Sequence, residues 1–307
     1  MKIVVGLGGN ALLRRGEPLT AEVQRRNVAR AADALAELAR EHDLVLTHGN
    51  GPQVGLLALQ NTAVAGAGHF PLDVLGAESE GMIGYMIAQE LRNRLPDCPV
   101  ATVLTQVEVD PDDPAFATPT KPVGPVYTDE QARELARTRG WDVAPDGDGY
   151  RRVVPSPTPL RVLEIDTIRL LVDVGTMVVC AGGGGIPVVF DPLGRVHGVE
   201  AVIDKDCSTA LVARELDADA LLLLTDVAAV HAGWRTPAAR PLRRVTPAEL
   251  ARYDFPEGSM APKVRAATGF VERTGHPAGI GALEDASRIV VGEAGTLIVP
   301  EPGRLST

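Results

Sequence analysis

The sequence predicts an α/β protein, a three-layer αβα sandwich around an open, mainly parallel sheet, with a protruding subdomain. Six short runs of Val, Leu and Ile are continuously apolar, as expected for parallel strands that are buried on both faces. Helical patterns separate these runs, and such an alternating order places helices on both faces of a sheet. A stretch rich in Pro, Asp and Gly, residues 110–159, interrupts the order and is predicted to form the subdomain.

The expected strands follow one another along the whole chain. They are Ile3–Leu7, Leu44–Thr47, Val100–Val107, Met177–Ala181, Ala220–Thr225 and Thr296–Val299. The first run is too short and too rich in glycine for the apolar core of a secretory signal. No run approaches the roughly 20 residues of a membrane span. We therefore expect these runs to build a sheet, and we expect no contact with a membrane.

The expected helices have recognisable ends. They are Ala21–Ala39, Glu164–Val174, Cys207–Leu216 and Pro262–Thr274, with a short one after Thr246. Gly175 follows the second, as is common after a helix C-terminus. Thr246 and Glu249 form a capping box around Pro247. Within residues 110–159 we expect a single helix, Thr128–Arg139, in a packed lobe; a disordered loop is the alternative.

Composition limits the classes of function. The chain has 307 residues, 40 acidic and 30 basic side chains, a net charge of -10 and a pI near 5.1. This acidity argues against a general nucleic-acid binder, which needs a basic face. The three cysteines, Cys98, Cys180 and Cys207, fit no zinc spacing and contain no C-x-x-C pair. They suit a reducing, cytoplasmic compartment.

Lysine is scarce in this chain. Four lysines stand against 26 arginines, so a lysine marks a place where a compact, mobile point charge is needed instead of a planar guanidinium. Lys205 and Lys263 each open an expected helix, where the helix dipole already favours anions. Asp204 is the expected N-cap of the first of these helices, and Asp206 is placed to hold Lys205. Two such lysines suit a polyphosphate; surface ion pairs are the alternative.

Glycine-rich loops follow three of the expected strands. They contain Gly8, Gly9 and Asn10, then Gly49, Asn50 and Gly51 after His48, then Gly182, Gly183, Gly184 and Gly185. Ligands of open α/β sheets bind beyond the carboxyl ends of the strands. Because glycine lets backbone N–H groups approach a ligand closely, the three loops together predict an anion site.

Several phosphate-binding motifs are absent or incomplete. No G-x-x-x-x-G-K-[ST] occurs, which excludes a P-loop enzyme, and no H-R-D or D-F-G motif of a protein kinase occurs. Residues 6–11 satisfy G-x-G-x-x-A, but residues 14–18 delay the helix that a dinucleotide fold would start there. The second strand ends in Thr47-His48 and not in an acidic residue.

Eight sequence blocks, in order from residue 6 to residue 263, resemble the carbamate kinases of the amino acid kinase superfamily. The most specific are His48–Gly55, Arg151–Pro157 and Val202–Asp206, and the others include Lys121–Pro125 and Gly258–Lys263. The resemblance implies a single domain over residues 1–307. Residues 1–215 would bind the phosphoryl acceptor and residues 216–307 the nucleotide. It also implies a homodimer.

The resemblance implies reversible phosphoryl transfer: ATP and carbamate give ADP and carbamoyl phosphate, with Mg²⁺. It places Lys121 of the subdomain, Lys205, Asp206 and Lys263 in catalysis, and the glycine loops with Asn10 and Asn50 at the acceptor. The nucleotide residues would be Thr225, Asp226, Val227, His231, Met260, Ala261, Pro262 and Lys263. No side chain is expected to bind the metal directly. Catabolic members work towards ATP after arginine breakdown.

Three departures from the family pattern are visible. Ala228–His231 replace the usual residues near the adenine, which leaves nucleotide preference open. Residues 279–283 are glycine-rich where relatives have an apolar strand. Glu80 stands where relatives usually have Gln, without an expected effect on the chemistry. The alternatives are a sister kinase acting on acetylglutamate, glutamate or UMP, and a nucleotide-binding regulator without turnover.

Overall fold

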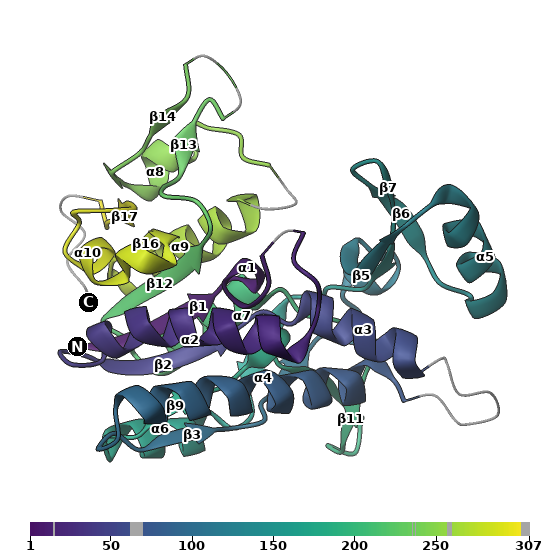
Figure 1. Ribbon diagram of the computed structural model, residues 1–307, viewed down its shortest axis with the longest axis horizontal. Helices are drawn as coiled ribbons and strands as arrows, with labels where there is room; N and C mark the ends of the chain where they lie inside the picture. The colour runs from purple at the N-terminus through teal and green to yellow at the C-terminus, as the bar shows by residue number, and fades with distance from the viewer. Residues whose placement is uncertain (15, 62–69, 235, 237, 257–259, 302–307) are drawn as a thin grey trace.

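The structure, a computed structural model, describes residues 1–14, 16–61, 70–234, 236, 238–256 and 260–301 (Figure 1). Within them an eight-stranded sheet forms the centre of the molecule. Its strand order is β15 (Arg244–Val245), β17 (Thr296–Ile298), β16 (Ala278–Ala282), β12 (Ala220–Thr225), β1 (Lys2–Leu7), β2 (Asp43–His48), β9 (Met177–Val179) and β3 (Val100–Thr102). The β16–β17 pair is antiparallel and the other neighbours are parallel, which confirms the predicted mainly parallel sheet.

Helices cover both faces of this sheet and complete the predicted three layers. One face carries α2 (Ala21–Leu38), α4 (Leu72–Arg94) and α10 (Ala286–Val290), and the other carries α6 (Ile165–Asp173), α7 (Lys205–Glu215) and α9 (Met260–Thr274). Strand β1 shows why two cores form. Ile3, Val5 and Leu7 pack with α2, while Val4 packs with α7 on the other side, because alternate side chains of a strand point to opposite faces.

Local signals set the ends of several helices. Thr20 accepts the N–H of Val23 at the start of α2. Capping boxes open α5 (Asp129–Arg139), with Thr128, and α8 (Pro247–Leu250), with Thr246, and the second confirms the predicted box. Helix α4 was not predicted, and its glycines explain why. A Cβ on Gly84 would lie 2.3 Å from Thr102 Cγ2, so that glycine serves close packing on β3.

Within the predicted residues 110–159, residues 121–154 form a folded lobe that projects from the main body (Figure 1), while Phe116 packs on the main core. Its three-stranded sheet has the order β5 (Lys121–Tyr127), β7 (Gly149–Val154) and β6 (Val143–Asp146), with α5 beside it. The alternative of a disordered loop is wrong. The three strands were not predicted, because prolines and glycines interrupt their short apolar patterns.

Two expectations about strands need correction. The run Val100–Val107 divides into β3 and β4 (Gln106–Val109), which belong to different sheets. At the start of β4, Gln106 N–H donates to Glu164 Oε2 at 2.7 Å. The glycine-rich residues 279–282 do form strand β16. A Cβ on Gly281 would lie 2.8 Å from Ile289 Cδ1, so small residues let α10 pack closely on that strand.

Strands β8 (Pro159–Val162), β10 (Ile186–Phe190) and β11 (Val196–Gly198) join β4 in a second, four-stranded sheet of order β11-β10-β4-β8, and β13 (His231–Ala232) pairs with β14 (Arg240–Pro241). The other elements are α1 (Gly9–Leu12), α3 (Gly51–Asn61), η1 (Pro114–Phe116), η2 (Gly182–Gly184) and η3 (Leu283–Asp285). Strand β12 of the expected nucleotide-binding part pairs directly with β1, so one sheet runs through both expected parts. Across the described chain, no helix has both the length and the apolar character to cross a membrane.

Candidate active site

The glycine loops after β1 and β2 meet at the carboxyl edge of the sheet. Gly8 N–H donates to Leu224 O at 2.9 Å, and a Cβ on Gly49 would lie 3.1 Å from Gly9 N. A Cβ on Gly9 or Gly51 would meet no atom within 4 Å, so both residues border open space. Asn10 lies in α1, and its side chain is outside what the structure describes. The predicted meeting of the first two loops is confirmed.

The third glycine loop is held in a conformation that needs glycine. Gly183 has φ 69° and Gly184 has φ 100°. A Cβ on Gly183 would lie 2.0 Å from Asn50 Nδ2, and one on Gly184 would lie 2.5 Å from Ile203 O. Asn50 is fixed in turn, because its Nδ2 donates to Ser79 Oγ at 2.8 Å. The loop therefore packs against the second glycine loop and against the segment that leads to Lys205.

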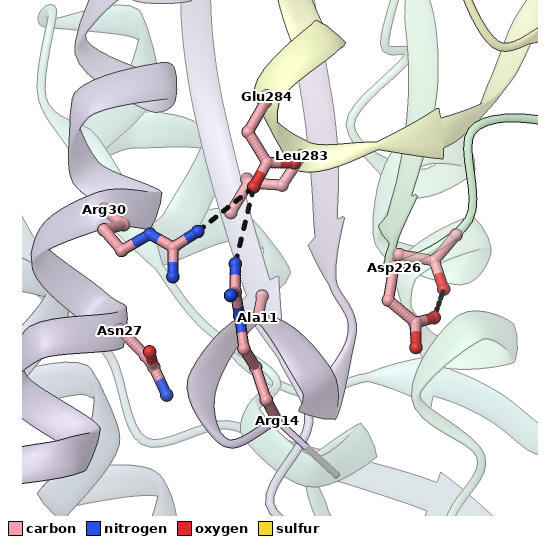
Figure 2. A pocket seen from close by; sticks show the side chains of 8 residues that line it. Ala11, Arg14, Asn27, Arg30, Asp226, Leu283 and Glu284 are labelled. Atoms are coloured by element: carbon pink, nitrogen blue, oxygen red, sulfur yellow. Dashed lines mark hydrogen bonds and ion pairs between the residues drawn. The ribbon is translucent and has the colours of Figure 1, made fainter. Parts of the chain in front are cut away.

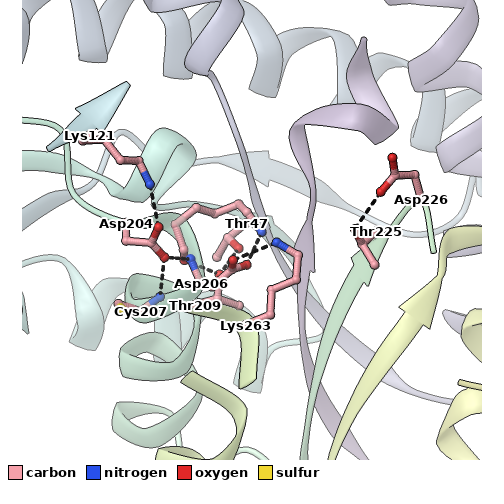
Figure 3. A network of polar contacts seen from close by, with 10 residues as sticks. Thr47, Lys121, Asp204, Asp206, Cys207, Thr209, Thr225, Asp226 and Lys263 are labelled. Atoms are coloured by element: carbon pink, nitrogen blue, oxygen red, sulfur yellow. Dashed lines mark hydrogen bonds and ion pairs between the residues drawn. The ribbon is translucent and has the colours of Figure 1, made fainter. Parts of the chain in front are cut away.

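Lys205, Asp206 and Lys263 form a buried charged cluster at the N-termini of α7 and α9 (Figure 3). Lys205 Nζ donates to Asp206 Oδ1, and Lys263 Nζ lies 2.9 Å from Asp206 Oδ2. Burial disfavours the charge of Asp206, but Lys205 and Lys263 outweigh it and lower the pKa of that carboxyl. Burial, with Lys263 nearby, lowers the pKa of Lys205. Asp206 thus orients both lysines, and the alternative of surface ion pairs is wrong.

Lys121 reaches the same cluster from the subdomain. Its Nζ lies 2.5 Å from Asp204 Oδ2, while Asp204 Oδ1 accepts the N–H groups of Asp206 at 2.9 Å and Cys207 at 3.3 Å. Asp204 is therefore the predicted N-cap of α7. The predicted subdomain has carboxylates of its own, among them Asp112, Asp113 and Asp129. Lys121 pairs with the core instead.

A layer of hydroxyl groups supports the first turn of α7. Thr209 Oγ1 lies 2.7 Å from Lys205 O and 2.6 Å from Thr47 Oγ1 of β2 (Figure 3). Ser208 Oγ donates to Gly184 O at 2.7 Å. These contacts tie the helix that begins with Lys205 to a neighbouring strand and to the third glycine loop. These contacts were not predicted from the sequence, although Ser208 and Thr209 lie one turn after the lysine.

Two buried titratable residues flank Gly182. A Cβ there would lie 2.4 Å from the His48 ring and 2.9 Å from Glu80 Cγ. His48 Nδ1 donates to Gly49 O at 3.1 Å, and burial lowers the pKa of His48 to about 4. Glu80 accepts the N–H of Gly182 at 2.8 Å and of Thr105 at 3.3 Å, and burial raises its pKa to about 8. Thus His48 contacts its own loop, and Glu80 is a further contact of the third loop.

Thr225 and Asp226 lie at the end of β12, to one side of the lysine cluster (Figure 3). Thr225 Oγ1 donates to Asp226 Oδ1 at 3.1 Å. Both residues border a cavity of about 300 Å³ (Figure 2). The other residues of its lining are Ala11, Arg14, Asn27, Arg30, Leu283 and Glu284. Arg14 and Arg30 lie 3.8 Å and 3.5 Å from Glu284 Oε1, so the pocket wall carries paired charges.

The other expected nucleotide residues lie in two segments. Met260, Ala261 and Pro262 form the first turn of α9 and place Lys263. Val227 is half-buried just beyond β12. His231 Nδ1 donates to Ala229 O at 3.0 Å, and the ring lies 5.4 Å from that of Trp234. In the part of the chain that the structure describes, no group of three His, Cys, Asp or Glu side chains is arranged to hold a metal ion.

The fold and this site define a phosphotransferase class, and the chain belongs to the amino acid kinase family, whose model matches residues 1–281. The carbamate kinase of Haemophilus influenzae is 53% identical over 307 residues, which are 100% of this chain and 99% of that protein. The carbamate kinase of Escherichia coli K12 is 53% identical over 96% of this chain and 98% of its own. These identities place the chain in the carbamate kinase branch.

Solved structures agree with this placement. Carbamate kinase from Giardia lamblia bound to AMP-PNP has a TM-score of 0.90 and 41% identity, and the match covers 98% of both chains. N-acetylglutamate synthase from Neisseria gonorrhoeae matches with a TM-score of 0.59 and 16% identity, over 98% of this chain and 61% of its own. That second likeness concerns the fold alone.

Proposed function

We propose that this chain is a carbamate kinase that transfers a phosphoryl group reversibly between ATP and carbamate. The observation that carries the proposal is the convergence of Lys205, Lys263 and Lys121 on two carboxylates at the glycine-lined edge of the sheet. Phosphoryl transfer depends on positioning and on neutralising charge, more than on covalent help from the protein. Three lysines and a set of backbone N–H groups supply both.

In the direction of ATP synthesis, a terminal phosphate oxygen of ADP attacks the phosphorus of carbamoyl phosphate. The bond between phosphorus and the carbamate oxygen breaks, and carbamate leaves with the electron pair. In the reverse direction the carbamate oxygen is already anionic, so no base has to remove a proton. This agrees with His48, which is completely buried: its Nδ1 donates to Gly49 O, and burial lowers its pKa to about 4.

Different residues of the chain would bind the acceptor and the nucleotide. The acceptor would lie against the loops of Gly8 to Asn10, Gly49 to Gly51 and Gly183 to Gly184. The nucleotide would lie between the Thr225–His231 segment and the Met260–Lys263 turn. Lys205 and Lys263 would contact the phosphoryl group as it moves, with Asp206 holding both. The open space beside Gly9 and Gly51 supports this placement of the acceptor.

Mg²⁺ would enter with the nucleotide. Magnesium in kinase sites is bound largely by substrate phosphates and water, with few protein ligands. Asp206 already accepts from two lysines, so its oxygens suit the orientation of cations better than direct coordination. The metal would neutralise phosphate charge, while the chain's lysines and N–H groups orient the phosphoryl group.

The proposal extends to the oligomeric state, the compartment and the pathway. Met82 and Tyr85 lie one turn apart on α4 and are exposed, as is Leu104 close to Gly81. This apolar patch supports a homodimer. The three cysteines are free, which supports a cytoplasmic protein. Work towards ATP after arginine breakdown is the expected pathway.

The deciding experiment mixes the protein with MgADP and carbamoyl phosphate and measures the ATP formed. Carbamate, acetylglutamate, glutamate and UMP are then compared as acceptors with MgATP. A higher kcat/KM for one of the last three would replace carbamate kinase by a sister kinase. Nucleotide binding without turnover of any acceptor would indicate a regulator.

A further inference from the structure

Asp204 occupies a position that links two parts of the molecule. It directly precedes α7, and its two oxygens have different partners. Oδ1 accepts the N–H groups of Asp206 and Cys207, while Oδ2 accepts Lys121 Nζ at 2.5 Å. The carboxylate therefore joins the subdomain to the first turn of the helix that begins with Lys205.

The ion pair between Asp204 and Lys121 is partly shielded from solvent. The Asp204 and Lys121 side chains are 23% and 30% exposed, so solvent screens the pair only in part. Burial opposes the charge of Asp204, and Lys121 outweighs it to lower the pKa of the carboxyl. An N-cap needs an acceptor but no charge, since Asn and Ser serve equally well. The cap alone therefore does not require the negative charge, and Lys121 is the cation that pairs with it.

The base of β5 is already fixed on the core, which limits where Lys121 can reach. A Cβ on Gly55 of α3 would lie 2.0 Å from Gly124 Cα, so the two backbones touch. Val123 packs in a cluster with Val54 and Val202. These contacts place the backbone of β5 near α7, but they do not direct the long, flexible side chain of Lys121. The contact with Asp204 directs that side chain.

We propose that Asp204 is a positioning residue for phosphoryl transfer: its carboxylate directs Lys121 towards the N-terminus of α7, where Lys205 and Lys263 meet the phosphoryl group. The inference rests on the proposed function. A lysine that is held near its working position loses less conformational freedom when substrate binds. Asp204 acts through Lys121 and needs no contact with substrate.

The test is a double-mutant cycle with Asp204→Asn and Lys121→Ala. Asp204→Asn keeps the helix cap and the side-chain shape, and it removes the charge. We expect it to lower kcat/KM for carbamoyl phosphate roughly 10-fold or more, as for loss of a charge-assisted contact, with the KM for MgADP unchanged. In the Lys121→Ala background it should cause little further loss. Hydrogen exchange of β5 should stay at the wild-type rate in Asp204→Asn, because contacts with α3 hold its backbone.

Asp113→Asn is the matched control. Asp113 is also a carboxylate cap in this region, accepting the N–H of Ala115 at 2.8 Å and of Thr158 at 2.9 Å, and its replacement should leave the kinetics unchanged. Provided that the wild type makes ATP, either of two results would overturn the inference. One is near-normal kinetics of Asp204→Asn, and the other is an equal loss of kcat/KM from Asp204→Asn in the wild-type and Lys121→Ala backgrounds. A wild-type protein that makes no ATP would overturn the proposed function itself.

Discussion

Glu80→Gln should change the pH dependence of stability, because Glu80 is buried where its charge is unfavourable. Its side chain is 1% exposed, and its pKa rises from 4.5 to about 8 on folding. Between these pH values the unfolded chain releases a proton that the folded chain keeps. The contribution of Glu80 to the stability of the fold is therefore fully present below about pH 4.5 and is lost as the pH rises towards 8.

The size of this effect follows from the two pKa values. By proton linkage, the raised pKa of Glu80 lowers the free energy of unfolding by about 1 kcal/mol at pH 5 and by about 4 kcal/mol at pH 8, relative to low pH. An unfolding entropy of roughly 2.1 cal/mol/K per residue makes 1 kcal/mol worth about 1.5 °C in Tm for a chain of this length. The wild type should therefore lose about 5 °C relative to Glu80→Gln between pH 5 and pH 8.

The assay is thermal unfolding of both proteins at pH 5, 6, 7 and 8. The amide introduced by Glu80→Gln can accept from Gly182, but its NH₂ group meets the Thr105 N–H donor, so the substitution also carries a cost that does not depend on pH. For this reason the change of the Tm difference with pH is the readout. Glu78→Gln, an exposed acid on the same helix, is the control. A Tm difference that stays constant from pH 5 to 8 would refute the buried-acid argument.

The remaining predictions concern the site. Lys205→Ala and Lys263→Ala should each lower kcat about 10²–10³-fold with the fold intact, measured by steady-state kinetics and circular dichroism. Lys205→Arg should also lower kcat substantially, since the planar guanidinium does not replace a buried point charge; a near-normal kcat would contradict this. Lys121→Ala should weaken carbamoyl phosphate turnover while calorimetry shows unchanged MgADP binding. Gly183→Ala should impair activity and lower Tm, because its Cβ would meet Asn50 at a positive φ; wild-type values for both would refute the packing argument.

Much of the architecture was predictable because it depends on local patterns. Continuous apolar runs indicated the parallel strands, and the capping boxes at Thr128 and Thr246 started helices where expected. Helix α4 and strand β16 were missed because glycine weakens both patterns locally. Their glycines are explained by neighbours distant in sequence, such as Thr102 against Gly84.

The sequence by itself determined which residues carry charge at the site. Lysine is scarce, and Lys205 and Lys263 stand at helix starts, where the dipole and the loop glycines favour an anion. The tertiary structure alone decided that Asp206, expected beside Lys205, also holds Lys263, and that Asp204 receives Lys121 from the subdomain. It also buried Glu80 against Gly182. Partners that are 83 or 102 positions apart meet only when the sheet and its covering layers are assembled, and burial, which sets the pKa values, exists only then.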